Sequence, residues 1–378
     1  MSTLLYNTLI RAYVDLGQAH NTLVLFTHML AHGAPPKSHT FPSLIKAASF
    51  SSSSLGQSVR NAISIDVVSW TSIINGFERN GCFSEAIKFF QKMITHEDVM
   101  ACLVRPNEAT YISVLSSCAN LNGGGALSSG KKIHGYVIRN EIKLTVFTGT
   151  ALIDLYGKTG CLRDAVNVFN QMVVKEVCTW NAMITTLASN GREMEALDMF
   201  EKMKMKGQHP NEVTFVAVLT ACARGKFVEL GLKLFQSMLH EFGIVAIMEH
   251  YGCVVDLLGR ASLLKEATDF IRSMPFEPDG SVLGALFGAC KIHGAIELGT
   301  VVGQKLLELQ PWHGGRFMVL SNTNVGVERW DHATDFRKPM AVAGIQKIPA
   351  YSLIYCKSLV ALLLVPTVVE NCLSNLWL

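Results

Sequence analysis

VFTGTALIDLYGKTGCLRDAVNVFNQM (residues 146–172) is followed by VCTWNAMITTLASNGREMEALDMFEKM (177–203), and the two stretches share one pattern. In each, two apolar segments of helical period are joined at a glycine. Anchors recur 31 residues later: Gly160, Ala165, Phe169 and Met172 return as Gly191, Ala196, Phe200 and Met203. Paired helices repeated every 30 to 35 residues or so are typical of a solenoid. We therefore predict an all-α, right-handed superhelical solenoid of antiparallel helix-turn-helix repeats.

The offset from the turn glycine to the phenylalanine and methionine of the second helix recurs in two further places. These copies are Gly17, Phe26, Met29 and Gly81, Phe90, Met93. Glycine permits the left-handed backbone that ends a first helix, and side chains three residues apart lie on one helix face. We therefore expect each Phe–Met pair to face the neighbouring helix.

Composition favours a stacked array over separate globular domains. Of the 378 residues, 49% are hydrophobic and 17% are charged, so most helix faces must be buried. The net charge of +3 is too small to indicate nucleic-acid binding by itself, so any bound RNA must be held by base contacts as well as phosphates. The ten cysteines include no Cys-x-x-Cys pair, which predicts buried thiols in a reducing compartment and no zinc site.

The pattern divides the chain into three parts. The repeat array covers residues 3–276 and looks compressed or partly deleted around 49–65. Two more helical hairpins are expected within 277–354, and an apolar tail follows at 355–378. The uninterrupted apolar run of this tail is far below the ~20 residues that span a bilayer, so we expect it to cap the array or to fray. The first residues already carry the repeat pattern, so we expect no targeting leader in this chain.

Several stretches resemble plant pentatricopeptide repeat proteins. The clearest are VVSWTSIINGFERNGCFSEAIKFFQKM (67–93) and the two copies quoted above. Their alternation with a longer unit that contains GKKIHGYVIRN (130–140) looks like the PLS subclass. HYGCVVDLLGRASLLKEA (250–267) and the segments up to residue 354 look like the terminal repeats and the E region of that subclass. We find no counterpart of the C-terminal zinc deaminase domain that many relatives carry.

The resemblance also assigns residues to RNA recognition. Helical-repeat readers present one base of single-stranded RNA to two or three side chains of each unit. In this family the fifth and last residues of a unit select the base, and second residues sandwich it. In the unit that starts at Val67, these residues are Thr71, Asn107 and Val68, which favour adenine.

Two further units carry polar readers. In the unit that starts at residue 146, Thr150 and Glu176 favour a purine, with Phe147 as the second residue. In the unit that starts at residue 177, Asn181 and Asn211 favour a pyrimidine, with Cys178 as the second residue. Asparagine and threonine offer compact hydrogen-bonding groups to a base edge, which is why these residue types suit the role.

The remaining units are less clear. Asn7 is of the type that reads a pyrimidine, although Lys37 is an unusual last residue. An asparagine near a helix start can also simply cap the helix, and this alternative stays open for Asn7 and Asn181. Apolar residues stand at the fifth position of the longer units, where they cannot read a base edge: Ile112, Val216 and Pro42.

Catalysis by this chain alone is not expected. A zinc deaminase needs a His-x-Glu followed by a Cys-x-x-Cys, and the sequence has no such combination. His134, His250 and His293 are scattered at repeat positions, where we expect them to pack or to cap helices. The glycine run 123–125 lacks the lysine of a phosphate-binding loop. We expect no cofactor, no metal and no small-molecule substrate.

The resemblance implies an organellar site-recognition factor for C-to-U RNA editing, in the mitochondrion or the chloroplast. Such a factor would bind single-stranded RNA and recruit a deaminase, or another editing-complex protein, through the E region; no membrane association is expected. Two other classes stay open: a protein-binding helical-repeat scaffold, and a decayed gene product with little function. RNA stabilisation or splicing without editing is a further alternative within the RNA-binding class.

Overall fold

The computed structural model describes residues 3–16, 18–34, 40, 43–44, 67–95, 105–121, 125–310, 315, 320–321, 337–338, 351–356 and 359–364. The chain divides into two compact units, residues 1–179 and 180–378. The first contains α1 (Thr3–Asp15), α2 (Ala19–Ala31), α5 (Val67–Arg79), α6 (Phe83–Thr95), α7 (Glu108–Asn120), α8 (Ala126–Arg139), α9 (Val146–Lys158) and α10 (Leu162–Gln171). The second contains α12 (Glu193–Met205), α13 (Glu212–Gly225), α14 (Val228–His240), α15 (Met248–Arg260), α16 (Leu264–Arg272), α17 (Gly280–His293) and α18 (Ile296–Leu309). Helix α11 (Val177–Ser189) crosses the boundary between the units.

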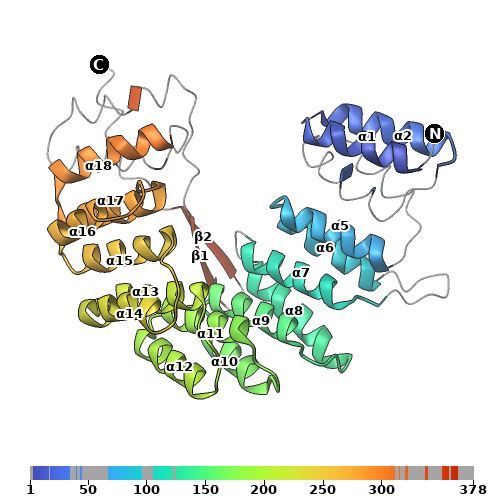
Figure 1. The fold of residues 1–378 in the computed structure, drawn as a ribbon. Coiled ribbons are helices and arrows are strands. Elements are labelled where there is room, and N and C mark those ends of the chain that lie inside the picture. Colours follow the sequence, from blue (N-terminus) through green and yellow to red (C-terminus); the bar gives the residue numbers. More distant parts are fainter. Residues whose placement is uncertain are drawn as a thin grey trace. The chain divides into compact units, whose positions relative to one another are not determined.

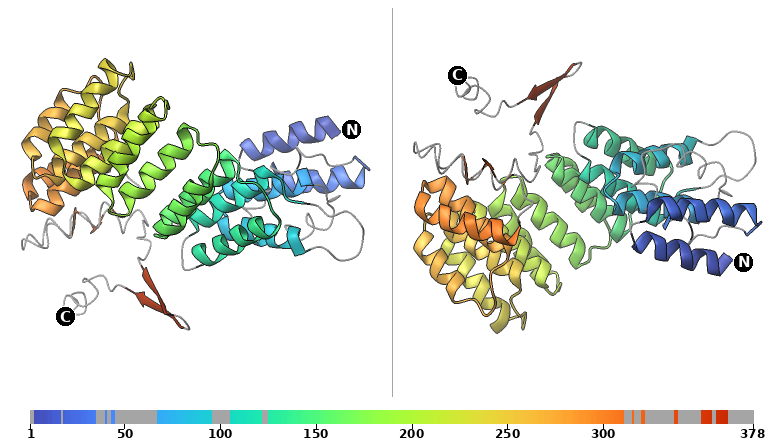
Figure 2. Two further views of the ribbon diagram at one scale, coloured as in Figure 1. Left: turned by 90° about the horizontal axis from the view of Figure 1, so that it is seen from below. Right: turned by 90° about the horizontal axis from the view of Figure 1, so that it is seen from above.

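Within each unit the helices form hairpins that stack on one another (Figures 1 and 2). In the first unit, α5 contacts α6 and α7, and α7 contacts α8 and α9. In the second unit, α13 contacts α14 and α15, and α15 contacts α16 and α17. Second helices also touch the next first helix, as α6 does with α7 and α14 with α15. This is the helical-repeat solenoid fold that the sequence predicts, and it places first helices such as α7 and α15 between neighbours.

The predicted Phe–Met anchors form the core of the hairpins. All eight of these side chains are exposed by 5% or less: Phe26, Met29, Phe90, Met93, Phe169, Met172, Phe200 and Met203. The phenylalanines also reach the next first helix, since Phe90 packs edge-on against Tyr111 and Phe200 against Phe215. Burying a large apolar side chain contributes about 1.5–3 kcal/mol, so these anchors explain why the pattern recurs at a fixed offset.

The turn glycines adopt the predicted left-handed backbone. Gly81, Gly160 and Gly191 have φ of 73°, 73° and 75°, whereas Gly17 lies outside the described residues. Ser262 follows α15 at the corresponding place and has φ of 66°. A residue with a Cβ pays a steric cost in this conformation, so the hairpin geometry there is imposed by packing rather than by the local sequence.

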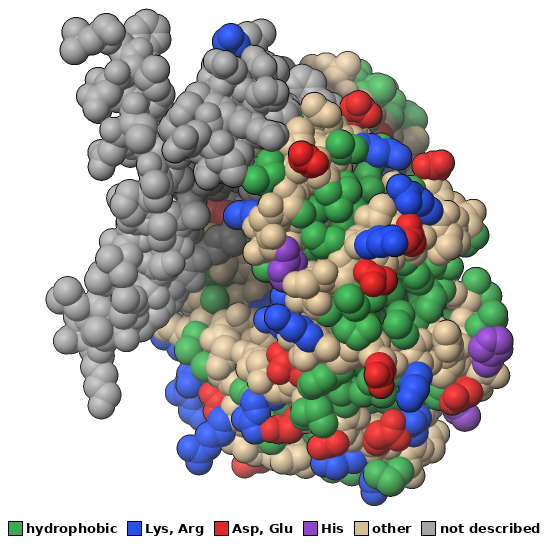
Figure 3. Space-filling view, turned by 90° about the vertical axis from the view of Figure 1, so that its left-hand side faces the viewer, with side chains coloured by type: hydrophobic (Ala, Val, Ile, Leu, Met, Phe, Trp, Pro, Cys, Tyr) green, Lys and Arg blue, Asp and Glu red, His purple; other side chains and the backbone are tan. Residues whose placement is uncertain are grey.

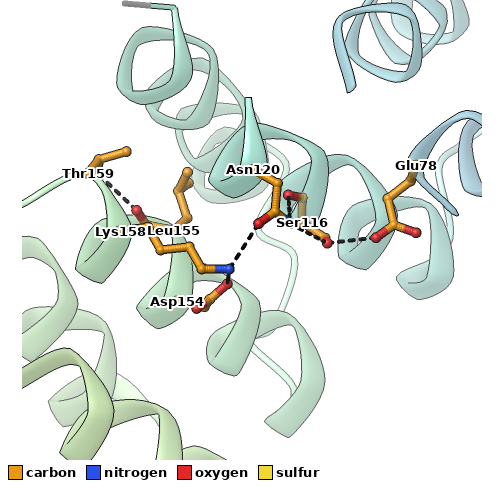
Figure 4. A network of polar contacts seen from close by, with 7 residues as sticks. All are labelled: Glu78, Ser116, Asn120, Asp154, Leu155, Lys158 and Thr159. Atoms are coloured by element: carbon orange, nitrogen blue, oxygen red, sulfur yellow. Dashed lines mark hydrogen bonds and ion pairs between the residues drawn. The ribbon is translucent and has the colours of Figure 1, made fainter. Parts of the chain in front are cut away.

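A chain of polar contacts joins three first helices of the first unit near their C-terminal ends (Figure 4). Ser116 of α7 donates a hydrogen bond to Glu78 of α5 (2.8 Å), and Asn120 donates to the Ser116 carbonyl (3.0 Å). Lys158 of α9 donates to the Asn120 Oδ1 (3.1 Å) and pairs with Asp154 (2.9 Å). These side chains are partly exposed, so each contact stabilises the fold only slightly, but together they favour one register of α5, α7 and α9.

The C-terminal part differs from the prediction. Strands β1 (Tyr351–Cys356) and β2 (Leu359–Leu364) pair antiparallel, with Tyr351 opposite Leu364 and Cys356 opposite Leu359. Helix had been expected up to residue 354, but runs of Tyr, Leu, Ile and Val separated by two residues favour a β-hairpin. Most of 311–350, the tail after 364 and the junction at 49–65 lie outside the described residues. Across the described part of the chain, no helix combines the length and the apolar character that a membrane span requires.

Candidate functional site

The first helices present an apolar second residue to solvent. Phe147 is the second residue of α9 and is 58% exposed, and Val68 and Cys178 are exposed at the same position of α5 and α11. The structure adds two members that the sequence analysis missed: Leu4 of α1 and Val213 of α13, which are exposed by 77% and 58%. Apolar side chains that recur at one exposed helix position suggest contact surfaces for flat apolar ligands such as bases.

The predicted readers Thr71 and Asn107 lie close together. The Thr71 hydroxyl donates to the Val67 carbonyl (2.7 Å) and lies 3.4 Å from the Asn107 Oδ1. Its closest side-chain partner is the Thr110 hydroxyl, at 2.7 Å. Asn107 caps α7, because its Oδ1 accepts the Thr110 N–H (3.0 Å) and Thr110 accepts the Asn107 N–H (3.2 Å). Through Thr110, the hydrogen bonds of this capping box therefore continue to Thr71, the fifth residue of α5.

Asn181 and Asn211 are joined directly. The Asn181 Nδ2 donates to the Asn211 Oδ1 (3.1 Å), and the Thr214 hydroxyl donates to the Asn181 Oδ1 (2.7 Å). Asn211 caps α13 through the Thr214 N–H (3.0 Å). Asn181 is buried, at 5% exposure, while Asn211 is partly exposed. The helix-capping alternative raised for Asn181 therefore applies to Asn211 instead.

The two other predicted pairs are arranged differently. The Thr150 hydroxyl bonds to the Val146 carbonyl (2.6 Å) and to Thr179 (3.0 Å), whereas Glu176 is exposed and the structure places no bond between it and Thr150. The Asn7 Oδ1 accepts a hydrogen bond from Thr40 (2.6 Å), and Lys37 lies outside the described residues.

Each of the four predicted fifth-position readers contacts a threonine that stands third in the first helix of the next unit. The sequence analysis did not identify these threonines. They are Thr40, Thr110, Thr179 and Thr214, and each is fully buried. The signal was visible, because SHT, EAT, VCT and EVT stand at the same place in successive units. At the same position of α15, His250 bonds to the Glu212 carbonyl (2.9 Å) and accepts the Ile247 N–H (3.1 Å), which is the capping role expected of it.

Basic side chains occupy the last turn of five first helices, and the sequence analysis gave their lysines and arginines no role; in α17 the basic residues are Lys291 and His293. Arg79, Lys158 and Arg260 end α5, α9 and α15, and Arg224 is the next to last residue of α13. Lys158 and Arg260 pair with Asp154 and Asp256 one turn earlier in the same helix. Arg224 donates to the Ser189 carbonyl (3.2 Å), so a phosphate would compete with the existing partners of Lys158, Arg224 and Arg260, whereas Arg79 has no partner within the part of the chain that the structure describes.

Charge and thiol chemistry give little sign of any other site. Lys and Arg are interspersed with Asp and Glu on the face drawn in Figure 3, and hydrophobic side chains lie between them. Burial raises the pKa of the Cys118 thiol to about 12 and those of Cys222 and Cys290 to about 11, so these thiols stay protonated. Among the described residues, no three His, Cys, Asp or Glu side chains lie together as metal ligands would.

Comparison with known proteins identifies the family. The pattern described as PPR repeat family matches residues 65–120 and 175–224, and the one described as PPR repeat matches 4–33, 150–177 and 213–241. The putative pentatricopeptide repeat-containing protein At1g10330 of Arabidopsis thaliana is 45% identical over 417 residues, which cover 92% of this chain and 88% of that protein. The chain belongs to the pentatricopeptide repeat family.

Other pentatricopeptide repeat proteins carry a compartment in their names. At1g06140, named mitochondrial, is 38% identical over 75% of this chain and 49% of its own length; At1g08070, named chloroplastic, is 35% identical over 78% and 39%, both from Arabidopsis thaliana. This chain thus spans half or less of these two relatives. Maize PPR10, solved in complex with an 18-nt psaJ RNA element, matches with a TM-score of 0.57 at 16% identity over 92% of this chain and 56% of PPR10. That likeness supports the fold.

Proposed function

We propose that this pentatricopeptide repeat protein binds single-stranded RNA in a sequence-dependent manner. The observation that carries the proposal is a repeated arrangement at the start of the first helices. There an exposed apolar second residue stands one turn before a polar fifth residue, and the fifth residue is hydrogen-bonded to the third-position threonine of the next first helix. Repeat proteins that read one base per unit need this combination of a stacking group and a fixed hydrogen-bonding group.

The chemistry of each unit follows from these groups. An exposed side chain such as Phe147 or Val213 offers an apolar surface to a base. Polar readers such as Asn181 with Asn211 satisfy the hydrogen-bonding groups of one base edge, and a mismatched base leaves groups unpaired. Basic residues such as Arg79 and Arg224 contact phosphates without regard to sequence. With a net charge of only +3, the base contacts supply much of the affinity.

Base preferences are proposed for three units on the resemblance to the family. Thr71 with Asn107 favours adenine, Thr150 with Glu176 favours a purine, and Asn181 with Asn211 favours a pyrimidine. Thr150 is bonded to Thr179 (3.0 Å), and Glu176 is exposed. The hydrogen bond between Asn181 and Asn211 (3.1 Å) and the proximity of Thr71 to Asn107 (3.4 Å) support their assignment as single reading units.

We also propose that the bound RNA is an organellar transcript and that the protein selects C-to-U editing sites, with the deaminase supplied in trans. The resemblance of residues 277–354 to the E region supports recruitment of a partner through that segment. The compartment names of the relatives support a mitochondrial or chloroplast location. RNA stabilisation or splicing would use the same surface without a deaminase.

The test is selection from a randomised single-stranded RNA pool, with sequencing of the retained fraction. Wild type is compared with Asn181→Thr plus Asn211→Asp, and with Asn167→Thr plus Asn170→Asp as the matched control, because the latter asparagines are exposed on the second helix α10. We expect a short motif in which only the reader variant shifts one nucleotide from a pyrimidine toward guanine. Absence of any enriched motif from folded wild type would refute RNA reading and favour the protein-binding scaffold.

A further inference from the structure

We propose that the third-position threonines are positioning residues that set the base preference of the reader in the preceding unit. The inference rests on the proposed RNA-binding function and concerns Thr214 most directly. Thr214 is fully buried and its hydroxyl lies 2.7 Å from the Asn181 Oδ1, so it acts on the base through Asn181.

The orientation of the Asn181 amide is fixed from the backbone of α13 outward. The Thr214 N–H can only donate, so the group of Asn211 that faces it at 3.0 Å must be the Oδ1. The Asn211 Oδ1 lies 3.0 Å from the Thr214 hydroxyl and also faces the Asn181 amide, whose Nδ2 donates to it at 3.1 Å. With its nitrogen committed to Asn211, Asn181 points its oxygen at the Thr214 hydroxyl. A reversed amide would bring two oxygens together.

This arrangement decides what a base would meet. An asparagine side chain has two N–H groups and two acceptor lone pairs. Asn181 uses one N–H on Asn211 and one lone pair on Thr214, and the Oδ1 of Asn211 is occupied by the cap. The groups left for a ligand are therefore mainly amide N–H donors of the two asparagines. They favour a base edge that offers acceptors, which fits the proposed pyrimidine with its ring carbonyl.

The same device recurs where the preceding fifth residue is polar. Thr40 bonds to Asn7 (2.6 Å), Thr110 to Thr71 (2.7 Å) and Thr179 to Thr150 (3.0 Å). Where the fifth residue is the apolar Val216, the third residue of the next first helix is His250, and it bonds to a backbone carbonyl instead. The side-chain contact from the third position is thus found where the preceding fifth residue is polar, and it is not a feature of every helix start.

Thr148 provides an internal control. It is a buried third-position threonine of α9 and interacts with its own cap, Thr145, through its N–H (3.2 Å) and its hydroxyl (3.2 Å). The fifth residue of the preceding first helix is Ile112, which has no group to orient. Replacing Thr148 therefore removes capping interactions of the same kind without disturbing a polar reader.

The experiment compares Thr214→Val, Thr214→Ser and Thr148→Val with wild type in the RNA pool selection, with thermal unfolding measured in parallel. We expect Thr214→Val to weaken discrimination about fivefold at the one nucleotide assigned to Asn181 and Asn211, the factor expected from one hydrogen bond of typical net strength. Other nucleotides of the motif keep their preference. Thr214→Ser retains the hydroxyl and restores the wild-type preference, and Thr148→Val changes stability only.

The inference is overturned if Thr214→Val keeps the wild-type preference at that nucleotide, or if Thr148→Val blurs a nucleotide equally. If Thr214→Val does not fold, Thr110→Val is used and the nucleotide assigned to Thr71 is scored in the same way. If wild type enriches a motif and the variants keep its preferences, only the positioning role is refuted. Failure of wild type to enrich any motif sinks the proposed function itself, so the two failures are distinguishable.

Discussion

Two glycines of α8 should respond in opposite ways to the same substitution. A Cβ placed on Gly135 would meet no atom within 4 Å, whereas a Cβ on Gly130 would lie 2.4 Å from a methyl carbon of Leu155 and 3.1 Å from its Cγ. Leu155 is completely buried in α9, so it cannot swing aside into solvent. A side chain at Gly130 would therefore force Leu155 to shift or α8 to move away from α9.

Alanine is favoured over glycine in a helix interior by about 0.5–1 kcal/mol. Gly135→Ala should gain this amount, because nothing opposes it. Gly130→Ala gains the same propensity but overpacks the core, which costs about 1–3 kcal/mol. The propensity gain cancels in the comparison, so the difference between the two variants isolates the packing cost of about 1–3 kcal/mol.

Urea denaturation followed by circular dichroism measures both variants against wild type. Because repeat arrays unfold in part through neighbouring units, hydrogen exchange of the α8 and α9 amides should accompany it. The expected result is a higher midpoint for Gly135→Ala and a lower one for Gly130→Ala. Equal stabilisation by both substitutions would show that α8 and α9 separate easily, and the close-packing argument would be wrong.

Three further outcomes are expected. Phe147→Ala should weaken RNA binding about tenfold in fluorescence anisotropy, since loss of one stacking group costs about 1–3 kcal/mol, while stability stays unchanged because the ring is exposed. Arg79→Gln plus Arg224→Gln should reduce the slope of log affinity against log salt by about 0.7 for each phosphate contact removed, without changing the selected motif. Burial lowers the pKa of His134, so the folded protein disfavours the protonated imidazole. The contribution of His134 to stability is therefore full above the unfolded pKa of about 6.5 and is lost as the pH falls below it. In urea titrations at several pH values, His134→Gln should reduce this loss of stability at low pH.

The fold was predictable because a few residues with unambiguous physical roles recur at fixed offsets. A glycine with positive φ ends the first helix, and a Phe–Met pair is buried on the second helix; Gly191, Phe200 and Met203 behave as the sequence predicts. The β-hairpin of β1 and β2 was not predicted because the family resemblance extended helix into it. Its own composition, rich in β-formers, was the better guide there.

The site was only partly predictable, because recognition residues were considered one unit at a time. Asn181 and Asn211 were proposed from their positions in the repeat, but Thr214 was not, since its contact with Asn181 appears only when three side chains from two helices are seen together. The role of Glu176 stays a prediction. Its position in the unit suggested a partner for Thr150, yet Thr179 takes that hydrogen bond and the glutamate stays exposed.

The shared use of Asn211 has a consequence for how recognition can change. Its Oδ1 caps α13 and also holds Asn181, so one atom serves both folding and the reader. Aspartate is as good a cap as asparagine, so Asn211→Asp alters the groups offered to a base while keeping the helix start intact. Asn211→Ala would lose the cap, at a cost of about 1 kcal/mol, together with the partner of Asn181. A change of base preference at position 211 should therefore use another residue that can cap a helix, because a side chain that cannot cap α13 would lower the stability of the protein.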